Sequence, residues 1–156
     1  MRIGSGPFLN VDWLYEIRNA RGFTRGVSLA ASVGNLSEIQ LFNPAGSGIT
    51  TIVHRFFASP SPAQVVNLRQ FNTGLATLVG TGFNLNVGGA AAVSEIRTAN
   101  PAAASGTFWA PIPLDSVTEL LIVQEWHAML GAGEGILLST DVANVALRVR
   151  FEWIEF

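Results

Sequence analysis

The chain has 156 residues, of which 49% are hydrophobic and only 13% charged, with a net charge of −2 and no cysteine. This length is enough for one domain with a hydrophobic core and short for two. The charge balance argues against a nucleic-acid partner. The chain contains no run of about 18 apolar residues, the length that would predict a membrane span. The lack of cysteine excludes disulfides and thiolate chemistry.

Residues 1–26 differ from the rest of the chain. Loop-forming sequences stand near both ends of this segment, and Asp12 is placed to cap a short helix that includes Trp13 and Ile17. The segment has no long apolar stretch of the kind that marks a secretory signal, so we expect the protein to be made in the cytoplasm. We expect residues 1–26 to form an N-terminal arm or a short helix with loops. A helix packed on its own domain and an arm laid over a neighbouring molecule both fit the pattern.

Residues 27–156 have the composition of β-structure. Short runs rich in Val, Ile, Leu and Phe are each bounded by Gly, Pro, Asn or Ser. The runs cover residues 27–33, 36–43, 49–59, 63–71, 91–98, 118–126, 135–140 and 144–156. Because no helical period separates them, the pattern predicts an all-β fold, an antiparallel sandwich of jelly-roll type with about eight strands and an N-terminal extension.

The last run, NVALRVRFEWIEF, alternates in character almost to the end of the chain. Its apolar positions within residues 145–153 are expected in the core, because alternate side chains of a strand share a face. The outer face would then carry the charged residues Arg148, Arg150 and Glu152. We expect Ile154 and Phe156 to lie against another subunit or the N-terminal segment. The alternative is a solvated outer face with a frayed end.

Few residues are candidates for catalysis or metal binding. The two imidazoles are His54 and His127, and Glu125 would share a strand face with His127. The chain contains no HExxH, GxSxG or SxxK motif, and its glycine-rich GAGEG and GTGFNLNVGG segments lack the lysine of a phosphate loop. We therefore predict a protein that is not an enzyme, binds no metal and needs no cofactor, with half-buried histidines packed beside aromatic residues.

Three segments together resemble the small β-sandwich structural proteins that tailed bacteriophages and prophages encode. They are LFNPAGSGITTIVHRFFAS, LRQFNTGLATLVGTGFNLNVGG and GAGEGILLSTDVANVALRVRFEW. The resemblance covers roughly residues 36–153. It implies a jelly-roll-like fold, self-association that is commonly trimeric, and work done by binding surfaces of a capsid decoration or cement protein or of a small virion appendage.

The composition agrees with that implication. Charged residues make up 13% of the chain, which is about half of the roughly 25% that is usual for soluble domains. Much of the surface must therefore be uncharged. We therefore expect a virion protein on the capsid surface that forms a homotrimer and binds the major capsid protein. The expected interface residues are Trp13, Tyr15, Arg18, Arg21, Arg148, Arg150, Ile154 and Phe156.

A different binding function is the alternative to capsid decoration. The chain would then be a receptor- or carbohydrate-binding module of a tail fibre or baseplate. Trp109 or Trp126 would have to be exposed in that case, because an aromatic face stacks well on a sugar ring. Packing in the core is the more common fate of tryptophan, and we expect it for both residues.

Overall fold

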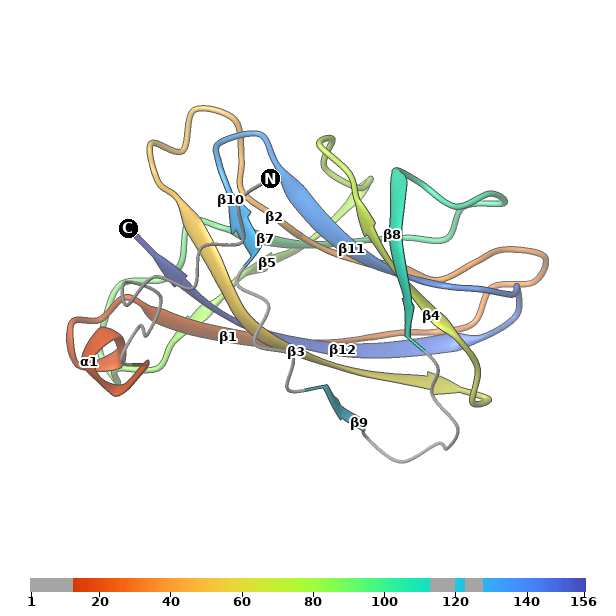
Figure 1. Ribbon diagram of the computed structural model, residues 1–156, viewed down its shortest axis with the longest axis horizontal. Coiled ribbons are helices and arrows are strands. Elements are labelled where there is room, and N and C mark those ends of the chain that lie inside the picture. The colour runs from red at the N-terminus through yellow and green to blue at the C-terminus, as the bar shows by residue number, and fades with distance from the viewer. Residues whose placement is uncertain (1–12, 113–119, 123–127) are drawn as a thin grey trace.

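The computed structural model describes residues 13–112, 120–122 and 128–156, which form one short helix and twelve strands (Figure 1). The prediction of an all-β chain is confirmed. The number of strands is higher than the eight expected. The four additional strands are Thr77–Thr81, Phe83–Asn84, Thr107–Ile112 and Ala128–Leu130. Most of their side chains are exposed or partly exposed, so these strands lack the apolar alternation that marks a half-buried strand.

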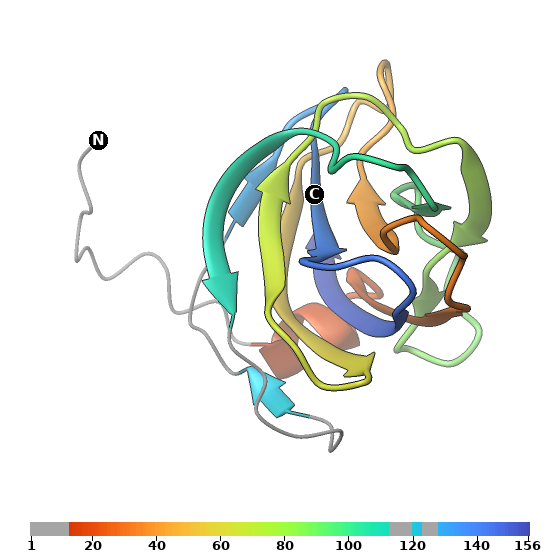
Figure 2. The same ribbon diagram turned by 90° about the vertical axis from the view of Figure 1, so that its right-hand side faces the viewer.

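The strands form two antiparallel sheets. The first sheet has the order β10 (Ala128–Leu130), β3 (Thr51–Ser61), β12 (Ala146–Glu155), β1 (Gly22–Leu29) and β6 (Phe83–Asn84), and β9 (Leu120–Ile122) also pairs with β3. The second sheet has the order β5 (Thr77–Thr81), β7 (Glu95–Ala99), β2 (Glu38–Phe42), β11 (Gly135–Thr140), β4 (Val66–Gln70) and β8 (Thr107–Ile112). Figures 1 and 2 show the sheets as two layers, compatible with a sandwich.

Strands that are far apart in the sequence pair in a nested order. β1 pairs with β12, β2 with β11, β3 with β10 and β4 with β8, always antiparallel. The chain therefore behaves like one long hairpin whose pairs alternate between the two sheets. β5, β6 and β7 are inserted between the two strands of the innermost pair, where β7 and β5 extend the second sheet beyond β2.

The core lies between the two sheets. The predicted inward face of the terminal strand is confirmed, because all five of its apolar residues are buried: Val145, Leu147, Val149, Phe151 and Trp153. The rings of Phe56 and Phe151 lie 6.3 Å apart in this core, and those of Phe23 and Trp153 lie 6.1 Å apart. Each aromatic ring buries more apolar area than a smaller side chain does, so these rings contribute strongly to the stability of the core.

Loops cover the outer face of the second sheet and are held there by side chains of the sheet. The amide of Gln40 binds the backbone of Phe71, Thr73 and Leu75, and the carboxylate of Glu38 accepts a hydrogen bond from the Ser105 amide. Both polar side chains are fully buried, so the loops cover this face at the central strand β2. The outer face of the first sheet is the one that carries exposed charged side chains.

Helix α1 (Trp13–Arg18) precedes β1 at one end of the sandwich (Figure 1), so the predicted short helix is present. β1 begins at Gly22, and the boundary expected after Gly26 falls within this strand. Glycine at position 22 permits close packing, because a Cβ there would lie 2.9 Å from the Ile17 side chain. Ile154 pairs with Gly22 across the sheet and is buried within the chain itself.

The end of the chain is tied to its neighbour strand. The Phe156 and Thr50 backbones exchange two hydrogen bonds of 3.0 Å, so the alternative of a frayed C-terminal end is wrong. The Phe156 ring itself is 46% exposed. The terminal strand thus ends with one covered apolar side chain, Ile154, and one that remains available at the surface.

Candidate functional site

Three neighbouring strands of the first sheet, β1, β12 and β3, bring outward-pointing side chains into aligned rows. The rows are Ser28, Arg148 and Ser59, then Gly26, Arg150 and Phe57, then Thr24, Glu152 and Arg55. Successive rows are about 7 Å apart, because alternate residues of a strand are separated by twice its rise. The three rows carry three arginines and one glutamate, so this face is locally positive although the chain is not.

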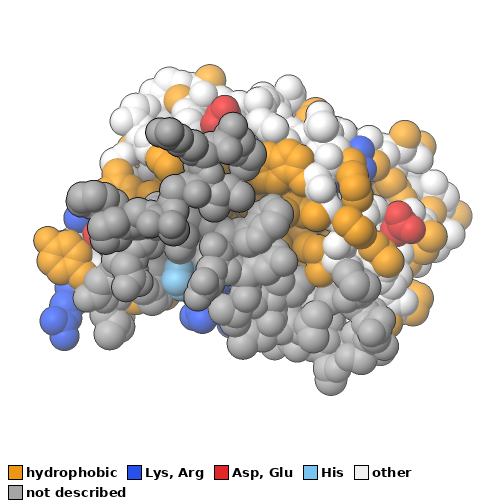
Figure 3. All heavy atoms as spheres, in the orientation of Figure 1, with side chains coloured by type: hydrophobic (Ala, Val, Ile, Leu, Met, Phe, Trp, Pro, Cys, Tyr) orange, Lys and Arg blue, Asp and Glu red, His pale blue; other side chains and the backbone are white. Residues whose placement is uncertain are grey.

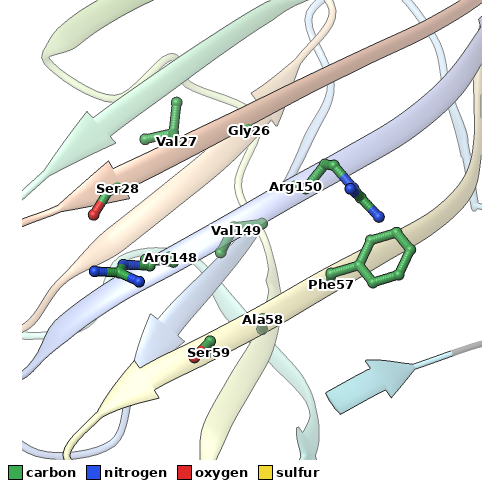
Figure 4. Close-up of a pocket in the computed structure, with 9 residues that line it drawn as sticks. All are labelled: Gly26, Val27, Ser28, Phe57, Ala58, Ser59, Arg148, Val149 and Arg150. Carbon is green, nitrogen blue, oxygen red and sulfur yellow. The ribbon is translucent and has the colours of Figure 1, made fainter. Parts of the chain in front are cut away.

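The first two rows border a groove. Residues 26–28, 57–59 and 148–150 line it, and its volume is about 360 Å³ (Figure 4). Gly26 leaves space in the groove because it has no side chain, and a Cβ built there would come no closer than 3.9 Å to Arg150. A volume near the lower end of the range for small-molecule sites, about 300–1,000 Å³, suits one small ligand.

The two arginines of the groove are held differently. The Arg150 guanidinium lies over the ring of Phe57, 3.9 Å from its centroid, and 3.7 Å from Glu152. Glu152 is itself the ion-pair partner of Arg55. Arg148 is exposed, and no ion pair or hydrogen bond joins its guanidinium group, which carries five N–H donors, to another described residue. Figure 4 shows the two arginine side chains pointing to opposite sides of Val149.

A second surface lies around helix α1, and we call it the α1 end. It consists of the exposed or partly exposed residues Tyr15, Arg18, Arg21, Phe83, Val87 and Phe156. Arg21 pairs with Glu16 at 2.8 Å and also lies over the Phe156 ring, 4.8 Å from its centroid. Hydrogen bonds from Asn84 and Asn86 to the backbone of Ala20 and Arg18 fix the segment containing Phe83 and Val87 against the helix connection.

The structure separates the predicted interface residues into these two surfaces. Tyr15, Arg18, Arg21 and Phe156 belong to the α1 end, and Trp13 begins the same helix. The groove contains Arg148 and Arg150, while Ile154 is buried and contributes to neither surface. Sequence reasoning missed Phe57, Ser28 and Gly26 in the groove, because their alignment with the arginines depends on strand register.

Trp109 is 41% exposed, so the expectation that it packs in the core is wrong. It lies on β8, an edge strand of the second sheet, beside the exposed Phe108. An edge strand buries less of each side chain than a central one, which explains the exposure. Trp126, Glu125 and His127 lie outside the described residues.

His54 is half-buried and occupies a β-bulge in β3. Glu152 of β12 pairs with Arg55 and Trp153 with Val53, which leaves His54 as the additional residue. The additional residue shifts the alternation of buried positions along β3, because two residues of the bulged strand lie opposite one residue of its partner. Among the described residues, no three His, Asp or Glu side chains are grouped so that they could hold a metal ion.

The arginines repeatedly lie over phenylalanine rings. Arg21, Arg25, Arg55, Arg97 and Arg150 each stand within 6 Å of a ring centroid. Energetically significant cation–π pairs occur about once per 70–80 residues, so about two would be usual here. Planar guanidinium groups stack in this way better than ammonium groups. The chain contains no lysine, and these contacts give its arginines a structural role whatever the origin of this bias in the coding sequence.

Comparisons of the chain with protein-family models, with curated proteins and with solved structures find no match. The described part of the chain has no helix with the length and apolarity needed to cross a lipid bilayer. The groove, the α1 end and the fold are therefore the features that bear on function.

Proposed function

We propose that the chain is a structural protein of a tailed-phage virion, a decoration or cement protein that oligomerises on the head surface and stabilises the shell. The α1 end is the observation that carries this proposal. It combines exposed aromatic and aliphatic side chains with an arginine whose charge is already paired with Glu16. Covering such a surface buries apolar area, and of its two arginines only Arg18 lacks an ion pair with another described residue.

We also infer that the sandwich is of jelly-roll type. The nested pairing supports this inference: β1–β12, β2–β11, β3–β10 and β4–β8 alternate between the sheets, as in a long hairpin rolled up on itself. Jelly rolls occur in viral capsid proteins and also in lectins and cupins, so the fold alone does not assign the function.

The sparse charge of the chain fits a particle component. Figure 3 shows hydrophobic and uncharged side chains over most of the described surface on one face, with charged groups few and scattered. A protein that is always covered by neighbours does not need charge repulsion to stay soluble. Many modest contacts to a repeating shell sum to stable attachment through avidity. In this proposal the partners are further copies of the chain, as a homotrimer, and the major capsid protein.

Particle association is the direct test of this proposal. Virions purified by density gradient from cells that make the chain should contain it in a fixed ratio to the major capsid protein, as measured by quantitative mass spectrometry. Shells that lack the chain should take it up from solution until this ratio is reached, and shells at saturation should withstand heating better. A chain that stays at the top of the gradient as a monomer would contradict the proposal.

A carbohydrate-binding module of a tail fibre or baseplate is the second candidate, and the exposure of Trp109 favours it. Phe108 and Trp109 stand together on an edge strand, where a sugar ring could stack on either ring. This candidate predicts binding on a glycan array that is lost in the Trp109→Ala variant. An array without any signal, together with uptake of the chain by shells, would decide for capsid decoration.

A further inference from the structure

We propose that the groove between β1, β12 and β3 is a binding site for a small hydroxylated carboxylate of the uronic acid class, with Arg148 as the residue that binds the carboxylate. This inference is separate from the proposed function, which depends on the α1 end. A decoration protein and a glycan-binding module could both carry such a site.

Charge complementarity selects an anion. Arg148 and Arg150 border the groove, and the one acid in the neighbouring row, Glu152, is already paired with Arg55. A carboxylate matches the forked donors of a guanidinium and can accept two parallel hydrogen bonds from it. Arg148 has these donors available at the groove, whereas Arg150 is fixed by the Phe57 ring.

The dimensions of the groove select a single small ligand. Its lining consists of three residues from each of three strands, about 7 Å along the strands and about 10 Å across them. An extended peptide advances about 3.3 Å per residue, so only two or three of its residues would fit. One six-membered sugar ring with its carboxylate fits within such a space.

The remaining lining groups suit the hydroxyls of a sugar. Ser28 is exposed on β1 directly across from Arg148, and a hydroxyl group can both donate and accept hydrogen bonds. Gly26 provides room beside Arg150 for the ring of the ligand, because its position has no side chain. The site therefore offers a guanidinium for the carboxylate, a hydroxyl partner and an open floor.

The experiment is an NMR titration of the full chain with glucuronate, in which backbone amide shifts of residues 26–28, 57–59 and 148–150 are followed. We expect saturable shifts confined to these residues, with a dissociation constant in the millimolar range that is usual for one sugar unit. Glucose, which lacks the carboxylate, should bind at least about 10-fold more weakly, the value of one charge-assisted hydrogen bond.

Two variants and one control locate the site. Arg148→Gln should weaken glucuronate binding about 10-fold or more, and Gly26→Val should abolish it by filling the groove without a change of charge. Arg18→Gln removes the same charge from an exposed arginine of α1 and should leave binding unchanged. Each variant is first checked for an unchanged amide spectrum away from the substitution.

Several outcomes would overturn the inference. Equal binding of glucose and glucuronate would exclude the role of the carboxylate, and equal losses in the Arg148 and Arg18 variants would reduce it to general charge attraction. Tighter binding of a short peptide of aspartates than of glucuronate would identify a protein ligand instead of a sugar. None of these results bears on whether virion shells take up the chain. Failure of the proposed uronate site can therefore be distinguished from failure of the proposed capsid decoration function.

Discussion

The indole ring of Trp153 occupies the space that a side chain at position 82 would need. A Cβ built on Gly82 would overlap the Cζ2 atom of Trp153, far inside van der Waals contact. Gly82 connects β5 of the second sheet with β6 of the first, so it lies where the chain crosses the edge of the sandwich. The tryptophan thus closes the core at this edge because residue 82 is glycine.

We predict that Gly82→Ala lowers the free energy of unfolding by about 3 kcal/mol, near the upper end for overpacked cores. The large ring and the buried Ala92 beside it can move little. Urea denaturation followed by tryptophan fluorescence measures the change. Gly26→Ala is the matched control, because the space at that position is open, and its effect should stay within about 0.5 kcal/mol. Equal stabilities of the two variants would contradict the packing argument.

Glu155 is a buried carboxylate that holds three donors. It accepts hydrogen bonds from the Trp153 indole at 3.0 Å and from the backbone amides of Val93 and Ser94 at 2.9 and 2.8 Å. We predict that Glu155→Gln costs about 2 kcal/mol, because an amide group turns one acceptor into a donor that faces another donor. Thermal and urea unfolding check this value. Glu95→Gln, which breaks a more exposed pair with Arg97, should cost at most about 1 kcal/mol.

Arg25 binds the edge of the opposite sheet. Its guanidinium donates to the carbonyls of Thr81 and Val79 and lies over the Phe83 ring. Lysine has one compact ammonium group and cannot reproduce the fork, so Arg25→Lys should destabilise the protein by about 1–2 kcal/mol. Amide hydrogen exchange should rise in β5 before the rest of the sheet. Arg18→Lys is the control, and equal exchange in both variants would show that arginine is not required at position 25.

Burial alternation explains which parts of the fold were predictable. The terminal strand alternates clearly, so its inward and outward faces could be assigned from the sequence. β8, with the sequence TFWAPI, is an exposed edge strand without alternation, and the same exposure invalidated the prediction for Trp109. β1 begins within GFTRG, whose two glycines are typical of a loop. One of them, Gly22, is required instead by the close packing of Ile17.

The groove was predictable only in part. The outward direction of Arg148 and Arg150 follows from the alternation of their own strand. Their alignment with Ser28 and Phe57 depends on the register of two other pairings, which no local pattern determines. The bulge at His54 changes the register within β3 as well. Sites that several strands share are therefore harder to find from sequence than the strands themselves.

The proposed self-association through the α1 end can be tested with two valines that are almost fully exposed. Val87 is 97% exposed and adjoins the segment held against α1, while Val33 is 94% exposed in the loop at the opposite end of β1. Neither side chain contributes to the core, so serine at either position should leave the unfolding free energy within about 0.5 kcal/mol of the parent value. Any difference between the two variants then reports on association.

We predict that Val87→Ser shifts the protein toward monomer and that Val33→Ser does not. Burial of one valine contributes about 1.5–3 kcal/mol, so each subunit contact should weaken roughly 10- to 100-fold. Light scattering across a dilution series measures the change as the concentration at which the mass per particle falls by half. If Val33→Ser has the larger effect, the subunits meet at the loop end of β1. If both variants stay fully assembled, Val87 lies outside the contact and the α1 end must be excluded as its centre.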